Sequence, residues 1–255
     1  MTFDVSHLAL RVWQRNMDTF LSLWKTESWP PFVEPLMHLM ALGYGVGAYV
    51  SNIGDQSYAA FIAPGIVASG AMFSSSFEGL FGTFLRMTYQ RTFDAIIATP
   101  ASLDDVILGE LLYGAARGTV AAIGVLVVLV ALGLVGLLFL AAALPIAFLA
   151  SLMFTGMAVF YTSFAPSFTV FNYYITLLIT PMFLFSGIFF PVEQLPAPLQ
   201  AVAWISPLSH VVAPLRALAH GQFGPADAGH LALVVVLALV FGVLAIIRMR
   251  TRLIR

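Results

Sequence analysis

Long apolar stretches alternate with short polar ones along almost the whole chain. A membrane-spanning helix requires about 20 largely apolar residues, because the hydrocarbon core of a bilayer is about 30 Å thick. Stretches of this kind occur at about 32–50, 58–82, 106–131, 137–161, 170–190 and 231–247. The pattern therefore predicts an all-α integral membrane protein with six transmembrane helices.

Residues 4–25 follow a different pattern, with apolar and polar positions on opposite faces of a helix. Asn16 and Thr19 interrupt the apolar face, which otherwise comprises Val5, Leu8, Ala9, Val12, Trp13, Phe20, Leu23 and Trp24. The polar face includes His7, Arg11, Gln14, Arg15, Asp18, Ser22 and Lys25. Such a basic amphipathic helix typically lies in the membrane interface, and the alternative is a helix packed on a partner. We expect an interfacial helix within residues 1–30 and a single transmembrane domain over 31–255.

Residues 186–216, SGIFFPVEQLPAPLQAVAWISPLSHVVAPLR, combine apolar character with the prolines Pro191, Pro196, Pro198, Pro207 and Pro214. Each proline lacks a backbone N–H and clashes with the preceding helical turn, so one continuous helix is excluded. The apolar composition argues against a solvated loop. We expect a broken, half-buried hairpin at the edge of the bilayer.

Lysine and arginine predict the orientation, because they concentrate on the cytoplasmic side. If the spans alternate, one side holds Arg11, Arg15, Lys25, Arg86, Arg91, Arg248, Arg250, Arg252 and Arg255. The other side holds Arg216, and Arg117 lies within the third span. This asymmetry predicts a multi-pass protein with both termini in the cytoplasm, a cytoplasmic connection at 83–105 and an external hairpin at 191–216.

Composition agrees with this class and narrows the chemistry. The chain is 60% hydrophobic and 9% charged, whereas soluble domains carry about 25% charged residues. A formal net charge of −1 gives no support to nucleic-acid binding. The absence of cysteine excludes disulfides and thiolate metal sites. The N-terminus lacks the pattern of a cleavable signal peptide.

Catalytic motifs are not found. Lys25 is the only lysine and has no glycine-rich loop before it, so the chain lacks a Walker phosphate loop. The histidines show no metal-binding spacing, and no serine lies in a nucleophile elbow. We expect no enzymatic activity, no metal and no directly bound cofactor.

Charged residues within spans are costly and so are candidates for function. They are Glu34, Glu78, Glu110 and Arg117. For Glu34 and Glu78 the alternative is snorkelling to the inner interface or pairing with a neighbour. Arg117 lies deeper, and we expect it to pair with Glu110, Glu78 or Glu34. Small residues at G-x-x-x-G spacing, Gly43 and Gly47 in span one and Gly114 and Gly118 in span three, indicate close helix packing, either within the chain or across a dimer.

The cytoplasmic connection contains a second amphipathic segment. Thr92 is a candidate N-cap for a short helix that Pro100 ends, and Phe93, Ile96 and Ile97 would form an apolar ridge. Asp104 and Asp105 precede span three, where the helix dipole favours negative charge. The short helix is expected either to dock into a soluble partner or to lie on the membrane.

Four motifs in order carry a family resemblance: QRTFDAIIATP, DDVILGE, ITPMFLFSGIFFPVEQLP and PLSHVVAPLR. Together they resemble the permease subunits of ABC-2 type exporters, and in particular the NodJ type, the nodulation lipo-oligosaccharide exporter permeases. The most specific part is Pro207-Leu208-Ser209-His210 followed by Arg216. The resemblance extends over nearly the whole chain.

The resemblance implies a homodimer in the bacterial inner membrane, driven by two ATP-binding cassette subunits that hold the ATP and magnesium. It implies a coupling segment that includes Arg86, Arg91, Thr92, Phe93, Asp94, Ile96 and Ile97. The external gate would be a re-entrant hairpin that includes Pro191, Leu195, Pro196, Trp204, Pro207, His210 and Arg216. Arg216 would either anchor at the outer headgroups or donate to hairpin carbonyls. His210 and Arg216 are six positions apart and so not on one helical face.

Spans one, two and five would line the path, with the candidates Tyr44, Phe61, Phe73, Tyr173, Phe183 and Phe185. Aromatic faces stack on sugar rings and also accept lipid tails or hydrophobic drugs; alternatively, these side chains face lipid or the core. We expect an amphipathic substrate such as a lipo-oligosaccharide or glycolipid, in contact with membrane lipids. The alternatives are a drug exporter, an ion-coupled secondary transporter that uses the four intramembrane charges as a relay, and a membrane scaffold.

Overall fold

The computed structural model describes residues 4–27, 30–50, 52–54 and 56–254. Most of this part of the chain is helical, and a two-residue antiparallel pair, β1 (Asn52–Ile53) with β2 (Gln56–Ser57), closes one turn. The α-helices are α1 (Leu8–Ser22), α2 (Trp24–Glu27), α3 (Pro30–Met40), α4 (Tyr58–Phe77), α5 (Thr92–Ile97), α6 (Leu103–Ala131), α7 (Leu137–Thr162), α8 (Phe171–Tyr174), α9 (Thr180–Phe185), α10 (Ala197–Ile205), α11 (Ser209–Ala219) and α12 (Pro225–Leu253).

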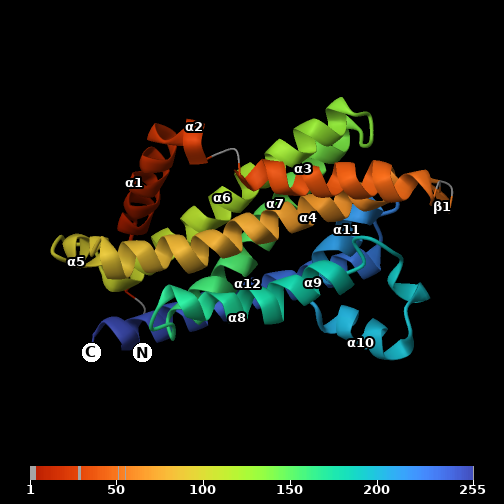
Figure 1. Ribbon diagram of the computed structural model, residues 1–255. Helices are drawn as coiled ribbons and strands as arrows, with labels where there is room; N and C mark the ends of the chain where they lie inside the picture. Colours follow the sequence, from red (N-terminus) through yellow and green to blue (C-terminus); the bar gives the residue numbers. More distant parts are fainter. Residues whose placement is uncertain (1–3, 28–29, 51, 55, 255) are drawn as a thin grey trace.

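Within the described residues, five helical segments are long and apolar enough to cross a membrane: Tyr58–Tyr89, Leu103–Ala131, Leu137–Thr162, Phe168–Phe185 and Pro225–Leu253. The pair α10 and α11, bent by 91°, is a broken span or a re-entrant loop. The predicted first span is α3 followed by a π-helical stretch, Ala41–Gly45, and a 3₁₀ turn, Val46–Ala48. Figure 1 shows this segment running alongside α4 to β1. The all-α membrane fold is confirmed.

The two ends of the bundle are formed by different elements. Both termini lie at the same end as α5, whereas β1 and α10 lie at the opposite end (Figure 1). This is the arrangement that the lysines and arginines predict for the cytoplasmic and external sides. Helix α1 runs across the long axis of the bundle, as an interfacial helix does.

Several predicted span boundaries differ in the structure. The second span continues to Tyr89, because π-helical turns at Glu78–Gly82 and Leu85–Tyr89 carry it past Gly82. The third begins at Leu103, where Ser102 and Asp105 form a capping box with two 3.0 Å hydrogen bonds. The last begins at Pro225 and ends at Leu253. The connection predicted at 83–105 is therefore shorter, and residues 83–89 belong to the bundle.

Helix α4 is the centre of the bundle. In the most apolar stretch of this span 83% is buried inside the protein, compared with 44% or less for the other spans. Helix α4 packs against α3, α6, α7 and α11. Small residues permit close approach: a Cβ on Gly79 would lie 2.7 Å from Ala158 Cβ. Gly114 and Gly118 likewise face α7, at Thr155 and Ser151, so this G-x-x-x-G pair serves packing within the chain.

Candidate functional site

Helix α1 docks on the start of α6. Its buried residues, Ala9, Val12, Asn16 and Phe20, form one stripe. Gly109 of α6 faces this stripe, and a Cβ added there would lie 2.6 Å from Val12 Cβ. The predicted apolar face is thus only partly buried, since Leu23 and Trp24 are exposed. The interfacial helix is fixed to the bundle rather than lying on the membrane independently.

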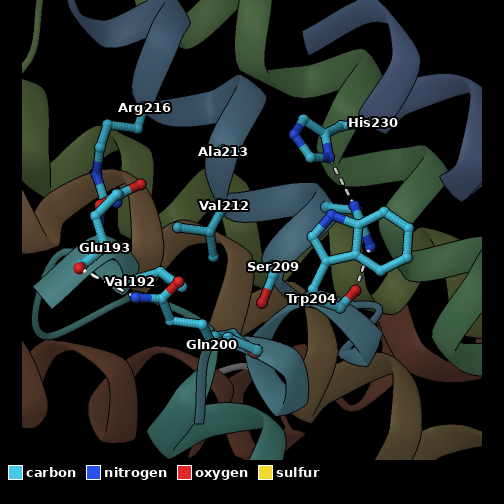
Figure 2. Close-up of a pocket in the computed structure, with 12 residues that line it drawn as sticks. Val192, Glu193, Gln200, Trp204, Ser209, Val212, Ala213, Arg216 and His230 are labelled. Carbon is cyan, nitrogen blue, oxygen red and sulfur yellow. Dashed lines mark hydrogen bonds between the residues drawn. The ribbon is translucent and has the colours of Figure 1, made fainter. Parts of the chain in front are cut away.

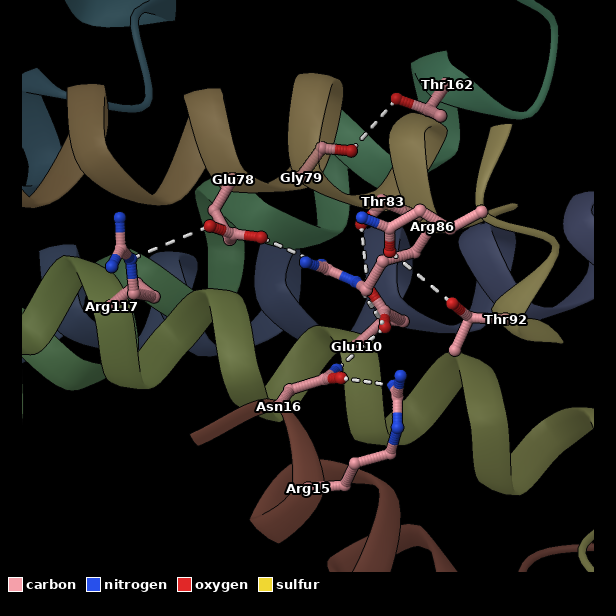
Figure 3. A network of polar contacts seen from close by, with 11 residues as sticks. Arg15, Asn16, Glu78, Gly79, Thr83, Arg86, Thr92, Glu110, Arg117 and Thr162 are labelled. Atoms are coloured by element: carbon pink, nitrogen blue, oxygen red, sulfur yellow. Dashed lines mark hydrogen bonds and ion pairs between the residues drawn. The ribbon is translucent and has the colours of Figure 1, made fainter. Parts of the chain in front are cut away.

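A buried polar network begins at this contact (Figure 3). Glu110 of α6 is 2% exposed, and its carboxylate accepts hydrogen bonds from Asn16 Nδ2 at 2.8 Å and Thr83 Oγ1 at 3.1 Å. Arg86 donates to Glu110 from Nε, at 2.9 and 3.0 Å, and from Nη2, at 2.5 Å. The same Nη2 also donates to Glu78 at 2.8 Å. Arg86 therefore bridges two carboxylates from two helical segments.

The fourth charge of the network is Arg117, whose Nε lies 3.6 Å from Glu78 Oε2. Its guanidinium also stacks over the Phe20 ring of α1, 4.3 Å from the centroid. Of the three partners predicted for Arg117, Glu78 is in contact with it. Glu34 lies in α3, and its side chain is outside the described part of the structure.

Arg86 corrects the sequence prediction. It was placed in the docking surface, but the π-helical turns rotate it to the face of Glu78, and its side chain is only 14% exposed. Among the described side chains of the network, two carboxylates face two guanidiniums. The sequence signal for this site was the polar Asn16 on the apolar face of 4–25.

Helix α5 presents a small surface at the end of the bundle that holds both termini. Arg91 adopts a left-handed conformation, with φ 48°, at the sharp turn from span two, and it is the N-cap; Thr92 is the first helical residue, so the predicted cap is off by one. Phe93 is 1% exposed and anchors α5 in the core. The three residues of the predicted ridge therefore do not share one exposed face: Phe93 is buried, Ile96 is half-buried and Ile97 faces outward. Asp94 also faces outward.

The two chain ends meet beside α5. Asp104, fully buried, accepts a 2.9 Å hydrogen bond from the Asp4 N–H and pairs with Arg250 Nε at 2.6 Å. Arg252 donates to the Thr162 carbonyl at 2.5 Å. Arg250 and Arg252 thus stabilise the end of the bundle at which both termini lie.

Aromatic side chains gather where spans one, two and five converge. Phe183 of α9 lies 5.0 Å from His38 of α3 and 5.2 Å from Phe73 of α4, between ring centroids. Among the other path candidates, Tyr44 and Tyr173 are exposed and Phe185 is half-buried. Phe61 does not line an open surface, because it is 4% exposed and lies beneath the Arg216 guanidinium.

At the opposite end of the bundle, α9 stops at Phe185, before Pro191, and Gly187 turns the chain with φ 77°. The hairpin then follows the prolines: Pro191 precedes a 3₁₀ turn that ends at Leu195, Pro196 is the N-cap of α10, and Pro207 lies in the turn before α11. Arg216 closes the hairpin by donating from Nη2 to the Gly187 carbonyl at 2.6 Å. Donation to a hairpin carbonyl was one of its two predicted roles.

A cavity of about 320 Å³ lies beneath the hairpin (Figure 2). Arg216 and Glu193 lie at one end of it, and Trp204 and His230 at the other. His210 also lines the cavity and contacts both Trp204 and His230. His210 and Arg216 thus line one cavity from two sides of α11, although they do not touch.

The imidazoles of His210 and His230 are hydrogen-bonded to each other. His210 Nε2 lies 2.8 Å from the Trp204 carbonyl and must donate to it, so neutral His210 accepts at Nδ1. His230 Nδ1, 2.6 Å away, is then the donor. The described residues contain no group of three or more metal-ligating side chains of the His, Cys, Asp or Glu type.

Comparison with known proteins agrees with this architecture. Residues 8–219 match the family described as ABC-2 type transporter. The chain is 38% identical to Nodulation protein J of Rhizobium meliloti (strain 1021), over 84% of this chain and 81% of that protein. It is also 38% identical, with the same coverage, to Nodulation protein J of Rhizobium leguminosarum bv. trifolii. Identity to the Inner membrane transport permease YadH of Escherichia coli (strain K12) is 23%, over 92% of this chain and 88% of that protein.

Proposed function

The chain belongs to the ABC-2 type transporter family, and from this membership we propose how it works within its exporter. It is the permease subunit and a multi-pass membrane protein. Separate ATP-binding cassette subunits, two per complex, bind ATP and magnesium and hydrolyse the ATP. Two copies of this chain form the membrane part, in the bacterial inner membrane with both termini in the cytoplasm.

The observation that carries this proposal is the construction of α5. The helix is held by the buried Phe93 while Asp94 and Ile97 face outward at the end that holds both termini. A cassette subunit that pushes on this surface moves a rigidly mounted helix. The motion reaches the bundle directly, because α5 lies between spans two and three.

The buried network supports transmission of that motion. Arg86 and Glu110 join the segments on either side of α5, and Asn16 adds α1 to the same unit. A displacement of α5 therefore moves three elements together instead of bending one. The proposed role of these charges is mechanical, because each carboxylate already has a basic partner within the network.

The substrate that we propose is a lipo-oligosaccharide, glycolipid or similar amphiphile. Similarity to Nodulation protein J points to this class. The aromatic cluster of Phe73, Phe183 and His38 offers ring faces where spans one, two and five converge. Tyr44 and Gly45 leave one face of the first span open, which supports a second copy or substrate on that side.

Co-purification tests the proposal. The tagged chain, expressed with its cassette subunit, is expected to retain that subunit in detergent and to stimulate its ATPase activity in nanodiscs. An Asp94→Arg variant places a cation on the outward face of α5 and is expected to lose the stimulation. Arg11→Glu, at an exposed position of α1, is the matched control and is expected to retain the stimulation. A chain that neither binds nor stimulates any cassette subunit would overturn the proposal.

A further inference from the structure

The cavity beneath the external hairpin has the dimensions of a ligand site. Its volume of about 320 Å³ is at the small end of the range for ligand pockets, about 300–1,000 Å³. It is lined by α10, α11, the first turns of α12 and the segment that holds Val192 and Glu193, and Figure 2 shows the polar side chains around one common space. A group the size of one ring fits such a space.

Two buried polar atoms on its wall lack a hydrogen-bond partner among the described residues: Arg216 Nε and Ser209 Oγ. Buried polar groups are nearly always hydrogen-bonded, and an unmade bond costs about 1–3 kcal/mol. Arg216 is otherwise fixed, by its 2.6 Å bond to Gly187 O and by the Phe61 ring 4.0 Å away. Both atoms are therefore able to hydrogen-bond to an oxygen from outside the chain.

The charged side chains on the cavity wall disfavour an ionic ligand. Glu193 lies beside Arg216, so an anion that reached the guanidinium would also meet a carboxylate (Figure 2). A cation would meet the guanidinium. A neutral ligand with several hydroxyl groups avoids both conflicts, because a hydroxyl donates to the carboxylate and accepts from the guanidinium.

Trp204 supplies an aromatic surface at the other end. It is 68% exposed, yet its position is fixed, because its carbonyl accepts from His210 and its ring meets that imidazole edge-on at 5.6 Å. A rigid, exposed indole next to hydroxyl-binding groups suits a sugar ring, whose C–H face packs on an aromatic face.

We propose that this cavity binds a neutral sugar unit of the exported substrate on the external side, with Trp204 as the stacking platform and Arg216, Ser209 and Glu193 as hydroxyl partners. The proposal rests on the exporter function described above and adds a specific place for the carbohydrate part of the amphiphile. The hairpin would then be a receiving site as well as a gate.

Calorimetry on the full-length chain in lipid nanodiscs tests the site. The probes are neutral tetrasaccharides of glucose and of N-acetylglucosamine, with inorganic phosphate as the anionic probe. We expect at least one tetrasaccharide to bind and phosphate not to bind. Trp204→Ala should weaken binding about tenfold or more, consistent with the loss of one stacked aromatic contact. Trp24→Ala, an exposed tryptophan at the other end of the chain, is the matched control and should change nothing.

Ser209→Ala separates binding from folding. The variant removes an unpartnered hydroxyl, so the free protein should be at least as stable as the wild type, while its sugar affinity falls. Tighter binding of phosphate than of any tetrasaccharide, or no sugar binding by a chain that still supports ATP-driven export, would overturn the site and leave the exporter function intact. Sugar binding by a chain that shows no ATP-driven export would contradict the exporter function instead.

Discussion

Asn16 of α1 donates a 2.8 Å hydrogen bond to Glu110 of α6, 94 positions further along the chain. The bond joins α1, which crosses the bundle near the end that holds both termini, to Glu110, which is more deeply buried than Glu78. Glu110 reaches across to Arg86, and Arg86 to Glu78. The amphipathic helix, span two and span three are therefore one mechanical unit.

Charge balance in this network predicts that substitutions of Arg86 and Glu110 have non-additive effects on the free energy of unfolding. Arg86→Met leaves Glu110 buried without its cation, and Glu110→Met leaves Arg86 with Glu78 alone. Each single change should destabilise by about 3–5 kcal/mol, as breaking a buried ion pair does. The double variant leaves Glu78 with Arg117 and restores the balance, so it should be more stable than either single variant. Thermal unfolding in detergent measures the cycle.

Arg11→Met is the control for that experiment, because Arg11 is exposed and should change stability by less than about 0.5 kcal/mol. Strictly additive losses in the double variant would show that Arg86 and Glu110 do not act as a pair.

Gly109 should be intolerant of even one methyl group. A Cβ at this position would lie 2.6 Å from Val12 Cβ, so Gly109→Ala is expected to push α1 away from α6. The gain of about 1 kcal/mol in helix propensity would not offset this clash. Protease sensitivity of the N-terminal helix should rise, together with a lower unfolding temperature.

Gly45→Ala provides the matched control, because nothing lies within 4 Å of its added Cβ. Adding Val12→Gly to Gly109→Ala should restore protection of α1. If Gly109→Ala leaves α1 protected, the docked position of α1 is wrong.

Substitutions on the buried and exposed sides of α5 should have different effects, the first on stability and the second on coupling to the cassette subunit. Phe93→Ala removes a fully buried ring and should cost about 3–5 kcal/mol. Ile97→Asp changes a side chain that is 41% exposed and should leave the unfolding temperature close to that of the wild type. It should nevertheless abolish the stimulation of ATPase activity by the substrate. Normal stimulation in a stably folded Ile97→Asp chain would remove α5 from the coupling surface.

The sequence predicts the large elements well, because their cause is local. Apolar length predicts the spans, and the prolines from Pro191 onward predict a broken hairpin instead of one continuous helix. The broken first span is harder to predict, because nothing in its apolar run signals the change to π-helical geometry at Ala41–Gly45.

Contacts between distant residues are less predictable. Arg86 was assigned to the cytoplasmic surface because the apolar run ends near Gly82. In the structure, π-helical turns continue the helix and turn Arg86 inward. Phe93 was assigned to a docking ridge for a similar reason, since a six-residue helix has too little periodicity to tell an anchoring residue from an exposed one.

ATP-driven export in proteoliposomes tests the central claim most directly. The chain is reconstituted with its cassette subunit, and transfer of a fluorescent lipo-oligosaccharide across the bilayer is followed with ATP inside or outside and with the proton gradient intact or dissipated. The account predicts transfer that requires ATP on the cytoplasmic face and survives dissipation of the gradient. Transfer that stops when the gradient is dissipated and proceeds without ATP would contradict it.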